Sequence, residues 1–375
     1  MRIAMIGAKG IPVETGMGGG VERVLEELTP RLASAGHHVT VYARPYANPS
    51  KRKTWEGVRL VTLPCIRVRY LETLSHVLLS TIHALFGGYD IIHFHAVGPS
   101  TAAWIPRLLA RRSKVVVTFH ARDQFHELRH PIARMYLAFG EWTAVRFPHA
   151  TIAVSHVIRT FCREHFHVNV AYIPNGVDIP AQIAFHTNEV RALGLEPGRY
   201  LLGVGRLVQF KAFDVALDAF RGVDTDMPFV LAGSPGYDKW YTKKLQRLAT
   251  RDPRVRLIGF QSGKALEQLL AHAYAVIHPS RIEGMSLAIL EAMSYGKLVI
   301  MSDIEENREI ADHAAVCVRM DDRDAFREAM QWAIQDPVMV KARGQRARQH
   351  VRQHYGWEFV VRETERLYER LIEQT

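Results

Sequence analysis

Short apolar runs rich in β-branched residues alternate with longer amphipathic stretches along almost the whole chain. This alternation is typical of a parallel sheet with helices on both faces. In the first part of the chain it predicts strands over residues 2–7, 37–43, 91–96, 114–120 and 151–155. It also predicts helices over 21–36 and 70–86, the second with leucine and isoleucine at helical spacing.

The alternation stops between residues 172 and 189, where Pro, Asn and Gly interrupt any regular element. It then resumes with strands predicted over 200–207, 227–234, 255–260, 275–280, 297–302 and 314–318. Helices are predicted over 213–223, 240–251, 265–273 and 286–296, with a last one over 356–373. We therefore predict two doubly wound, Rossmann-like α/β domains, residues 1–178 and 179–357. Ligands of such sheets bind beyond the carboxyl ends of the strands, so we expect the site in a central cleft.

The basic charge is concentrated in the first domain. Up to Asp178 the chain has 21 Lys and Arg against 12 Asp and Glu, and after it 27 against 26. A basic face could meet an anionic membrane surface or an anionic acceptor, and an ordinary solvated surface is the alternative. Because no helix-turn-helix, RNP-like motif or zinc finger accompanies the charge, we expect no nucleic acid partner.

Three features bear on location. No window has 18 uninterrupted apolar residues, and the first residues lack the pattern of an export signal. The three cysteines are isolated and without CxxC spacing, so neither disulfides nor a zinc site are predicted. These features favour a cytoplasmic protein, peripheral at the inner face of the cell membrane if the basic face binds lipid.

The strongest local signal follows the fourth strand of the second domain. Its loop carries Glu283, and a helix begins near Ser286. Backbone amides at Gly284, Met285 and Ser286 would attract phosphate oxygens. Glu291 lies about two turns inside the helix, and a carboxylate suits the vicinal hydroxyls of a ribose. Two glutamates at this spacing also occur by chance in many helices.

A second signal follows the first strand of the same domain. Gly205 ends the strand, and Arg206 and Lys211 lie in the turn after it. Two cations near a helix N-terminus suit a diphosphate, Arg through its planar fork and Lys as a compact charge. A pair of surface cations is the alternative.

The first domain adds two candidates. Gly19 and Gly20 belong to a glycine-rich loop between the first strand and the first helix, where the backbone can approach a ligand closely. The loop is not GxGxxG, which disfavours a nicotinamide dinucleotide. His120 ends a strand and is followed by polar residues, so we expect it to face the cleft, although satisfying a local backbone group would explain it equally well.

Two apparent metal motifs are interpreted as structural. His93 and His95 alternate on one strand without cysteines or carboxylates at ligand spacing. The segment 224–226, Asp-Thr-Asp, resembles a metal-binding DxD but directly precedes a strand, so we predict a turn there. No metal site is predicted.

Eight segments occur in an order that resembles a known family. They are residues 18–43, 115–123, 151–159, 173–178, 204–211, 229–235, 255–260 and 279–296. With them the chain resembles the retaining glycosyltransferases of family 4, the glycosyl transferases group 1, which have the GT-B fold. The resemblance spans nearly the full length. It implies that residues 358–375 form a helix that returns to the N-terminal domain.

The resemblance also implies roles for the candidates. Arg206 and Lys211 would bind the diphosphate of a nucleotide-sugar donor, Glu283 would lie near the donor sugar, and Glu291 at the ribose. His120 would contact the transferred sugar. Backbone contacts would come from Gly19, Gly20, Gly284, Met285 and Ser286.

The predicted function is therefore retaining transfer of a sugar from a nucleotide-diphosphate donor, without a metal or other cofactor. The acceptor would be a saccharide or a lipid-linked saccharide, in surface polysaccharide or glycolipid synthesis. Two alternatives share the architecture, a sugar-nucleotide epimerase and a non-catalytic glycan-binding descendant. Three positions depart from the family pattern, with Ala212 and Ser286 in place of Gly and Leu298 in place of Pro.

Overall fold

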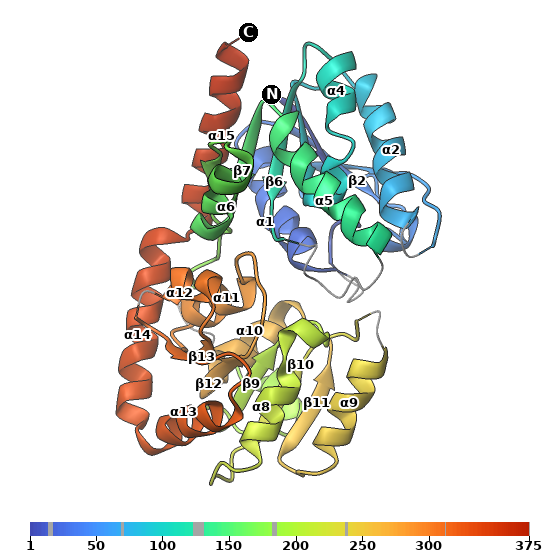
Figure 1. Ribbon diagram of the computed structural model, residues 1–375. Helices are drawn as coiled ribbons and strands as arrows, with labels where there is room; N and C mark the ends of the chain where they lie inside the picture. The colour runs from blue at the N-terminus through green and yellow to red at the C-terminus, as the bar shows by residue number, and fades with distance from the viewer. Residues whose placement is uncertain are drawn as a thin grey trace. The chain divides into compact units, whose positions relative to one another are not determined.

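The chain folds into two compact units (Figure 1). The computed structural model describes residues 1–13, 18–68, 71–122, 131–181, 186–236, 239–311 and 313–374. Unit 1 comprises Met1–Asn175 together with Trp357–Thr375, and unit 2 comprises Gly176–Gly356. Parts of the predicted glycine-rich loop (14–17), of the polar run after His120 (123–130) and of the predicted linker (182–185) lie outside the described residues.

Unit 1 is built on an eight-stranded sheet in the order β3-β4-β2-β1-β5-β6-β7-β8. All its pairs are parallel except β3 with β4. The strands are β1 Arg2–Ile6, β2 His38–Ala43, β3 Thr54–Trp55, β4 Val58–Thr62, β5 Ile91–His95, β6 Lys114–Phe119, β7 Ala150–Ala153 and β8 Ala171–Tyr172. The five strands predicted for this part of the chain are confirmed. Strands β3, β4 and β8 were not predicted.

The helices of unit 1 form two contacting groups. They are α1 Gly20–Ser34, α2 Leu71–Leu85, α3 Val97–Ser100, α4 Trp104–Leu109, α5 Pro131–Arg146, α6 His156–Phe166 and α15 Trp357–Glu373, with a 3-10 turn at Pro45–Ala47. Helix α1 contacts α15, whereas α2 contacts α3 and α4, and α3 contacts α5. Gly7, directly after β1, has φ +125°, and a Cβ there would lie 2.4 Å from the carbonyl oxygen of His95. Glycine at this position therefore lets the chain segments after β1 and β5 approach each other.

The last helix, α15, belongs to unit 1 although it follows unit 2 in sequence. The hydroxyl of Tyr368 lies 2.6 Å from His93 Nδ1, inside the core of the sheet. His37 Nε2 contacts Glu365 Oε1 at 2.9 Å, and Arg31 lies over the ring of Trp357. The final helix therefore completes the first domain, as the resemblance implies.

Unit 2 has a six-stranded, fully parallel sheet in the order β11-β10-β9-β12-β13-β14. The strands are β9 Leu201–Val204, β10 Phe229–Ala232, β11 Val255–Gly259, β12 Ala275–His278, β13 Leu298–Ser302 and β14 Val316–Val318. All six predicted strands are confirmed. This order is that of a doubly wound sheet, whose strand order reverses between β9 and β12.

Helices cover this second sheet. They are α7 Asn188–Ala192, α8 Phe213–Phe220, α9 Lys239–Ala249, α10 Gly263–His272, α11 Leu287–Ser294, α12 Glu305–Ala311, α13 Arg323–Gln335 and α14 Pro337–His354, with a 3-10 turn at Gln209–Lys211. Helices α8, α9, α13 and α14 bury an apolar cluster against the sheet. The cluster joins Leu201 and Phe229 of the strands to Phe213 and Phe326 of the helices. The cluster includes side chains of β9 and β12, and the loops that follow these two strands carry the candidate site.

Candidate active site

The loops that follow β9 and β12 are joined at the point where the strand order reverses. The two strands pair in parallel, so their carboxyl ends lie at the same edge of the sheet. The backbone amide of Arg281 donates to the carbonyl of Phe210 at 2.8 Å. The guanidinium Nη1 of the same residue donates to the carbonyl of Gln209 at 2.6 Å. Lys211 Nζ lies 2.5 Å from Glu283 Oε1. Two candidates that are 72 residues apart in sequence are thus in direct contact.

Glu283 is the centre of this arrangement. Its side chain is 9% exposed, and Oε1 accepts hydrogen bonds from Lys211 Nζ and from His278 Nε2 at 2.7 Å. Burial by itself raises the pKa of the carboxyl, but the charge of Lys211 and the hydrogen bond from His278 outweigh it and hold the pKa well below its usual range. Glu283 is therefore ionised, and its negative charge is balanced by a neighbouring cation.

His278, the last residue of β12, is a site residue that the sequence analysis missed. It is fully buried, and burial lowers the pKa of its imidazole, an effect that Glu283 partly offsets. A neutral imidazole beside an ionised carboxylate must carry its proton on Nε2 to donate to Glu283. The hydroxyls of Ser280 and Ser286 lie 3.0 and 3.2 Å from the same nitrogen. His278 therefore orients Glu283 through its hydrogen bond to the carboxylate. In the sequence, the only indication of this role was its position at the end of a predicted strand.

Helix α11 begins beside this carboxylate. Ser286 is its N-cap, and its hydroxyl accepts a hydrogen bond from the amide of Ile289. The side chain that departs from the family pattern thus supplies a cap that glycine lacks. The buried Gly284 and Met285 lead into this helix start, where first-turn amides without helical partners attract anions. Glu291 lies on the same helix, half-buried.

Arg206 occupies a different setting from Lys211. It follows Gly205, whose φ of +153° favours glycine, and its side chain is exposed with the guanidinium 5.7 Å from the ring centre of Phe210. An exposed guanidinium over an aromatic face remains accessible to an anionic ligand. The structure therefore brings Lys211 and Glu283 together and leaves Arg206 at the surface of the same loop.

The backbone conformation of Ala212 shows how the loop accommodates alanine where the family pattern has glycine. Its φ of +49° and ψ of 28° are left-handed, the conformation that glycine adopts most easily. Its methyl group is fully buried in the apolar cluster of unit 2. The loop thus follows a glycine-like path without glycine, and Lys211 keeps its position.

In unit 1, a buried glutamate closes the glycine-rich loop. Glu22 accepts hydrogen bonds from the amide of Lys9 at 2.8 Å and from the amide of Gly19 at 2.6 Å. One side chain of α1 therefore ties together the two ends of the loop. Gly20 is the first residue of α1. The assignment of Gly19 and Gly20 to a ligand stays a prediction.

This arrangement predicts the effect of Glu22→Gln. The side-chain NH₂ of glutamine would face one of the two backbone N–H groups that Glu22 now accepts from. That N–H group would lose its acceptor, and leaving a buried donor unsatisfied costs about 1–3 kcal/mol. We expect a loss of unfolding free energy of that size and weaker donor binding, measured by thermal unfolding and by KM. Glu27→Gln is the matched control, since Glu27 pairs with Arg23 and Arg31 on the same helix. Equal unfolding temperatures for the two variants would refute the loop-closing role.

His120 lies in a stack of histidines on neighbouring strands. Its Nε2 is 3.1 Å from His95 Nδ1, with the two rings stacked. His93 contacts the hydroxyls of Tyr368 and Thr118 through its two ring nitrogens. Burial lowers the pKa of His93 to about 3 and that of His95 well below its ordinary value. His93 and His95 are thus neutral core residues, as predicted, and the contact of His120 with a sugar stays a prediction.

The segment 224–226 forms a turn, as predicted. The hydroxyl of Thr225 accepts a hydrogen bond from the amide of Met227 at 3.1 Å. Asp226 forms an ion pair with Arg199. The two acidic side chains therefore belong to the turn that leads into β10.

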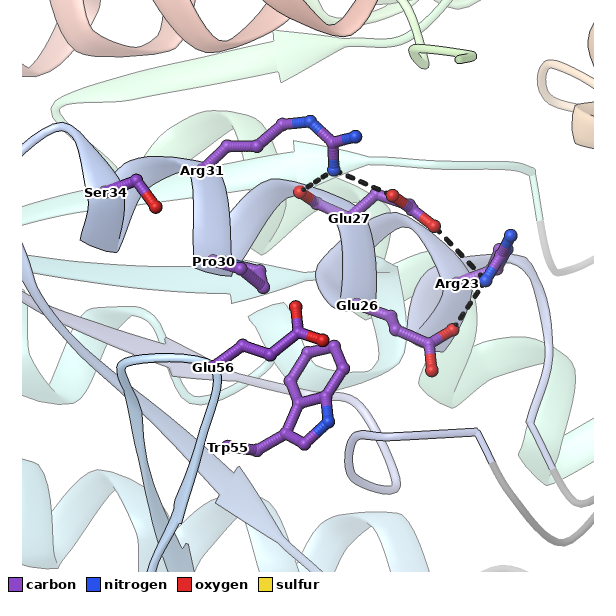
Figure 2. Close-up of a pocket in the computed structure, with 8 residues that line it drawn as sticks. All are labelled: Arg23, Glu26, Glu27, Pro30, Arg31, Ser34, Trp55 and Glu56. Atoms are coloured by element: carbon purple, nitrogen blue, oxygen red, sulfur yellow. Dashed lines mark hydrogen bonds and ion pairs between the residues drawn. The ribbon is translucent and has the colours of Figure 1, made fainter. Parts of the chain in front are cut away.

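A pocket of about 500 Å³ lies along α1 and beside the β3–β4 hairpin (Figure 2). Its lining residues are Arg23, Glu26, Glu27, Pro30, Arg31, Ser34, Trp55 and Glu56. Arg23 contacts Glu26 at 2.9 Å and Glu27 at 3.2 Å, and Arg31 contacts Glu27 at 2.7 Å. These charges neutralise one another, and none of the predicted site residues lines the pocket.

Comparison with known proteins identifies both halves of the chain. Residues 18–180 match the family model Glycosyltransferase Family 4, and residues 187–350 match the model Glycosyl transferases group 1. The D-rhamnosyltransferase WbpZ of Pseudomonas aeruginosa is 25% identical, over 89% of this chain and 88% of that protein. The phosphatidyl-myo-inositol mannosyltransferase of Mycolicibacterium smegmatis is 26% identical, over 98% of this chain and 94% of that protein.

Solved structures agree in fold. Sucrose-phosphate synthase from Thermosynechococcus elongatus superposes with a TM-score of 0.85 at 20% identity, and all of each chain is covered. HepE of Anabaena, in complex with UDP and glucose, superposes with a TM-score of 0.79 at 19% identity, covering 98% of this chain and 99% of that one. The predicted two-domain GT-B fold is confirmed.

Proposed function

Because this chain belongs to the family 4 glycosyltransferases, with a group 1 domain in its second half, we propose that it transfers a sugar with retention of anomeric configuration and without a metal ion. The donor is a nucleotide-diphosphate sugar. The acceptor is a saccharide or a lipid-linked saccharide, in surface polysaccharide or glycolipid synthesis. The observation that carries the proposal is the buried contact of Lys211 with Glu283 beside the start of α11.

The chemistry follows from where charge develops. When the bond between the anomeric carbon and the diphosphate breaks, negative charge grows on the leaving oxygen. Arg206, Lys211 and the first amides of α11 would stabilise this charge more strongly in the transition state than in the ground state. Because these groups supply positive charge, the reaction needs no divalent cation for this purpose.

Glu283 would act on the other side of the same bond. An ionised carboxylate held by His278 and Lys211 accepts hydrogen bonds from sugar hydroxyls and orients the donor sugar. Lys211 would then bridge Glu283 and the diphosphate, so one cation links the sugar end of the donor to its leaving group. Glu291 would bind the ribose hydroxyls.

The lipid-linked acceptor is supported by the relatives. One of them, from Arabidopsis thaliana, is named as part of a phosphatidylinositol N-acetylglucosaminyltransferase and is 22% identical over 94% of this chain and 79% of that protein. The mannosyltransferase named above also acts, by its name, on a phosphatidylinositol. We infer that this chain likewise meets its acceptor at the inner face of a membrane.

Stereochemistry and metal dependence test the mechanism. Incubated with its donor, the protein should release or transfer a sugar whose first-formed anomer matches the donor, as seen by proton NMR before mutarotation. The initial rate should be the same with and without excess EDTA. Inverted product, or activity abolished by EDTA and restored by a divalent cation, would contradict the proposal.

A further inference from the structure

We propose that one helical face of unit 1 docks on the surface of an anionic lipid bilayer. The docking face consists of residues 66–68, the outward side of α2, Phe86 and α4. The inference deepens the proposed function, because such a bilayer would present a lipid-linked acceptor. Binding to the bilayer is measured without sugar transfer, so the two proposals can fail separately.

Helix α2 turns its largest exposed side chains, which are apolar, away from the protein. Its buried side carries the polar residues His76, Ser80 and Thr81 together with Val77 and Ala84. The outward side chains are Leu71, Leu78, Leu79 and Ile82, followed by Phe86, which is 86% exposed. A helix that only covers a soluble core turns its apolar stripe inward. The outward stripe of α2 therefore indicates a second apolar environment.

Burial confirms that the polar side faces the protein. The imidazole of His76 is fully buried, and this burial lowers its pKa to about 4. Thr81 donates to the carbonyl of Val77 within the helix. The exposed leucines of α2 therefore lie on the side of the helix opposite to these buried residues.

Helix α4 combines apolar and basic side chains. Trp104, Leu108 and Leu109 are exposed, Leu109 to 69%. Arg107 lies among them and is also exposed. Exposed arginines follow at 111 and 112. Apolar side chains that enter the headgroup region, with cations at its level, are typical of helices bound to anionic membrane surfaces.

The two helices form one continuous surface. They contact each other and lie on the same side of unit 1 in Figure 1. They precede β5 and β6, which pair in parallel, so both helices end at the same edge of the sheet. The hydroxyl of Ser113 donates to the carbonyl of Tyr89 at 2.7 Å and joins the two loops. Phe86 and Leu109 therefore belong to the same end of the docking face.

A third segment extends the face at the other end of α2. Ile66 and Val68 are each more than half exposed, with the exposed Arg67 between them. The amide of Ile66 donates to the hydroxyl of Ser75 at 3.0 Å, which holds this segment on α2. The pattern of apolar residues beside a cation is thus repeated.

The charges favour a bilayer over a second copy of the chain. Among the described residues of the docking face, the exposed side chains with a permanent charge are arginines, and the one acidic residue, Glu72, is bound to Arg44 at 2.7 Å. A twofold interface would bring these arginines towards one another, which is unfavourable, whereas anionic headgroups neutralise them. In the described part of the chain, no helix is long and apolar enough to cross a membrane.

Sedimentation with vesicles tests the docking face. The full chain should bind vesicles of phosphatidylcholine with phosphatidylglycerol, bind weakly to phosphatidylcholine alone, and be released by high salt. Leu108→Glu/Leu109→Glu and Ile82→Glu/Phe86→Glu should each lower the partition coefficient at least about tenfold, because each adds two negative charges and removes two apolar anchors. Val338→Glu/Met339→Glu, on α14 of unit 2, is the control, since Val338 is 78% exposed.

Three outcomes would overturn the inference. The first is that the wild type does not bind vesicles, and the second is that the face variants bind vesicles like the control. The third is that the wild type is a dimer and the face variants are monomers with unchanged vesicle binding. Thermal unfolding of each variant without ligand shows whether it is folded. Face variants that unfold cooperatively near the wild-type temperature are folded, so their loss of vesicle binding reports on the surface. If instead vesicles bind and no nucleotide does, the proposed donor site fails and the docking face stands.

Discussion

Replacing Lys211 with alanine should lower the rate of sugar transfer about 100- to 1000-fold, which corresponds to about 2.7–4 kcal/mol of lost transition-state stabilisation. The physical reason is that Lys211 would face the leaving diphosphate, where negative charge develops. It is already held by Glu283 at 2.5 Å, so less conformational freedom is lost when the donor binds than for an unrestrained lysine. The variant should also lose the stabilisation that the nucleoside diphosphate gives the wild type.

Thermal unfolding against uridine, guanosine, adenosine and thymidine diphosphates measures this loss and identifies the base. A ligand at 100 times its dissociation constant adds about 2.7 kcal/mol to the wild type. Each variant is compared with and without ligand, because Lys211→Ala also leaves the charge of Glu283 without its cation. Lys341→Ala, an exposed lysine on α14, is the control and should respond like the wild type. If no diphosphate stabilises the wild type, the donor site assigned here is wrong.

Glu283→Gln should lower the free energy of unfolding by about 3–5 kcal/mol and reduce transfer at least about a hundredfold. Removing one partner of a buried ion pair leaves the other charge uncompensated. Here the charge left behind is that of Lys211, whose side chain is only 14% exposed. Loss of activity follows separately, because the carboxylate would orient the donor sugar.

A double variant separates the two effects of Glu283. Lys211→Met/Glu283→Gln removes both charges, so it should recover much of the stability that Glu283→Gln loses. Its transfer activity should stay as low as that of the single variants. Glu305→Gln, at the exposed start of α12, controls for removal of a surface carboxylate. A double variant less stable than the sum of the single variants would contradict the ion pair.

The pH dependence of stability gives a further measure of the same pair. The folded-state pKa of Glu283 is lowered relative to the unfolded chain, so its contribution to stability is complete above the ordinary glutamate pKa of about 4.3. It is lost as the pH falls below that value. The difference in unfolding free energy between wild type and Glu283→Gln, from denaturant titrations, should be largest near neutral pH and shrink at acid pH. A difference that grew at acid pH would contradict the assignment.

The strands and main helices could be predicted because their signals are local. The strands β10, β12 and β13 of unit 2 are buried on both faces, so their sequences are short apolar runs bounded by turn residues. Of the missed strands, β4 has five residues, of which two are buried. The other two, β3 and β8, have two residues each and lie at the ends of the sheet of unit 1. Segments of two residues are too short to show a periodic pattern of apolar residues.

Within the site, the candidates were found by residue type and their contacts were not. Lys211 and Glu283 were each proposed as donor-binding residues, yet no spacing rule joins positions 72 residues apart. His278 was passed over because a histidine at a strand end has many uses. Its role became visible only once Glu283, Ser280 and Ser286 were seen around one nitrogen.

Two doubly wound domains, the family and the charged candidates for a donor site could all be predicted from the sequence. Hydrophobic periodicity and turn residues are short-range properties, and motifs keep their order along the chain. The pairing of β9 with β12 and the outward direction of Leu71, Leu78 and Leu79 on α2 could be seen only in the folded protein. These depend on which apolar surfaces bury each other across long sequence separations, and that choice is made by the packing of the whole domain.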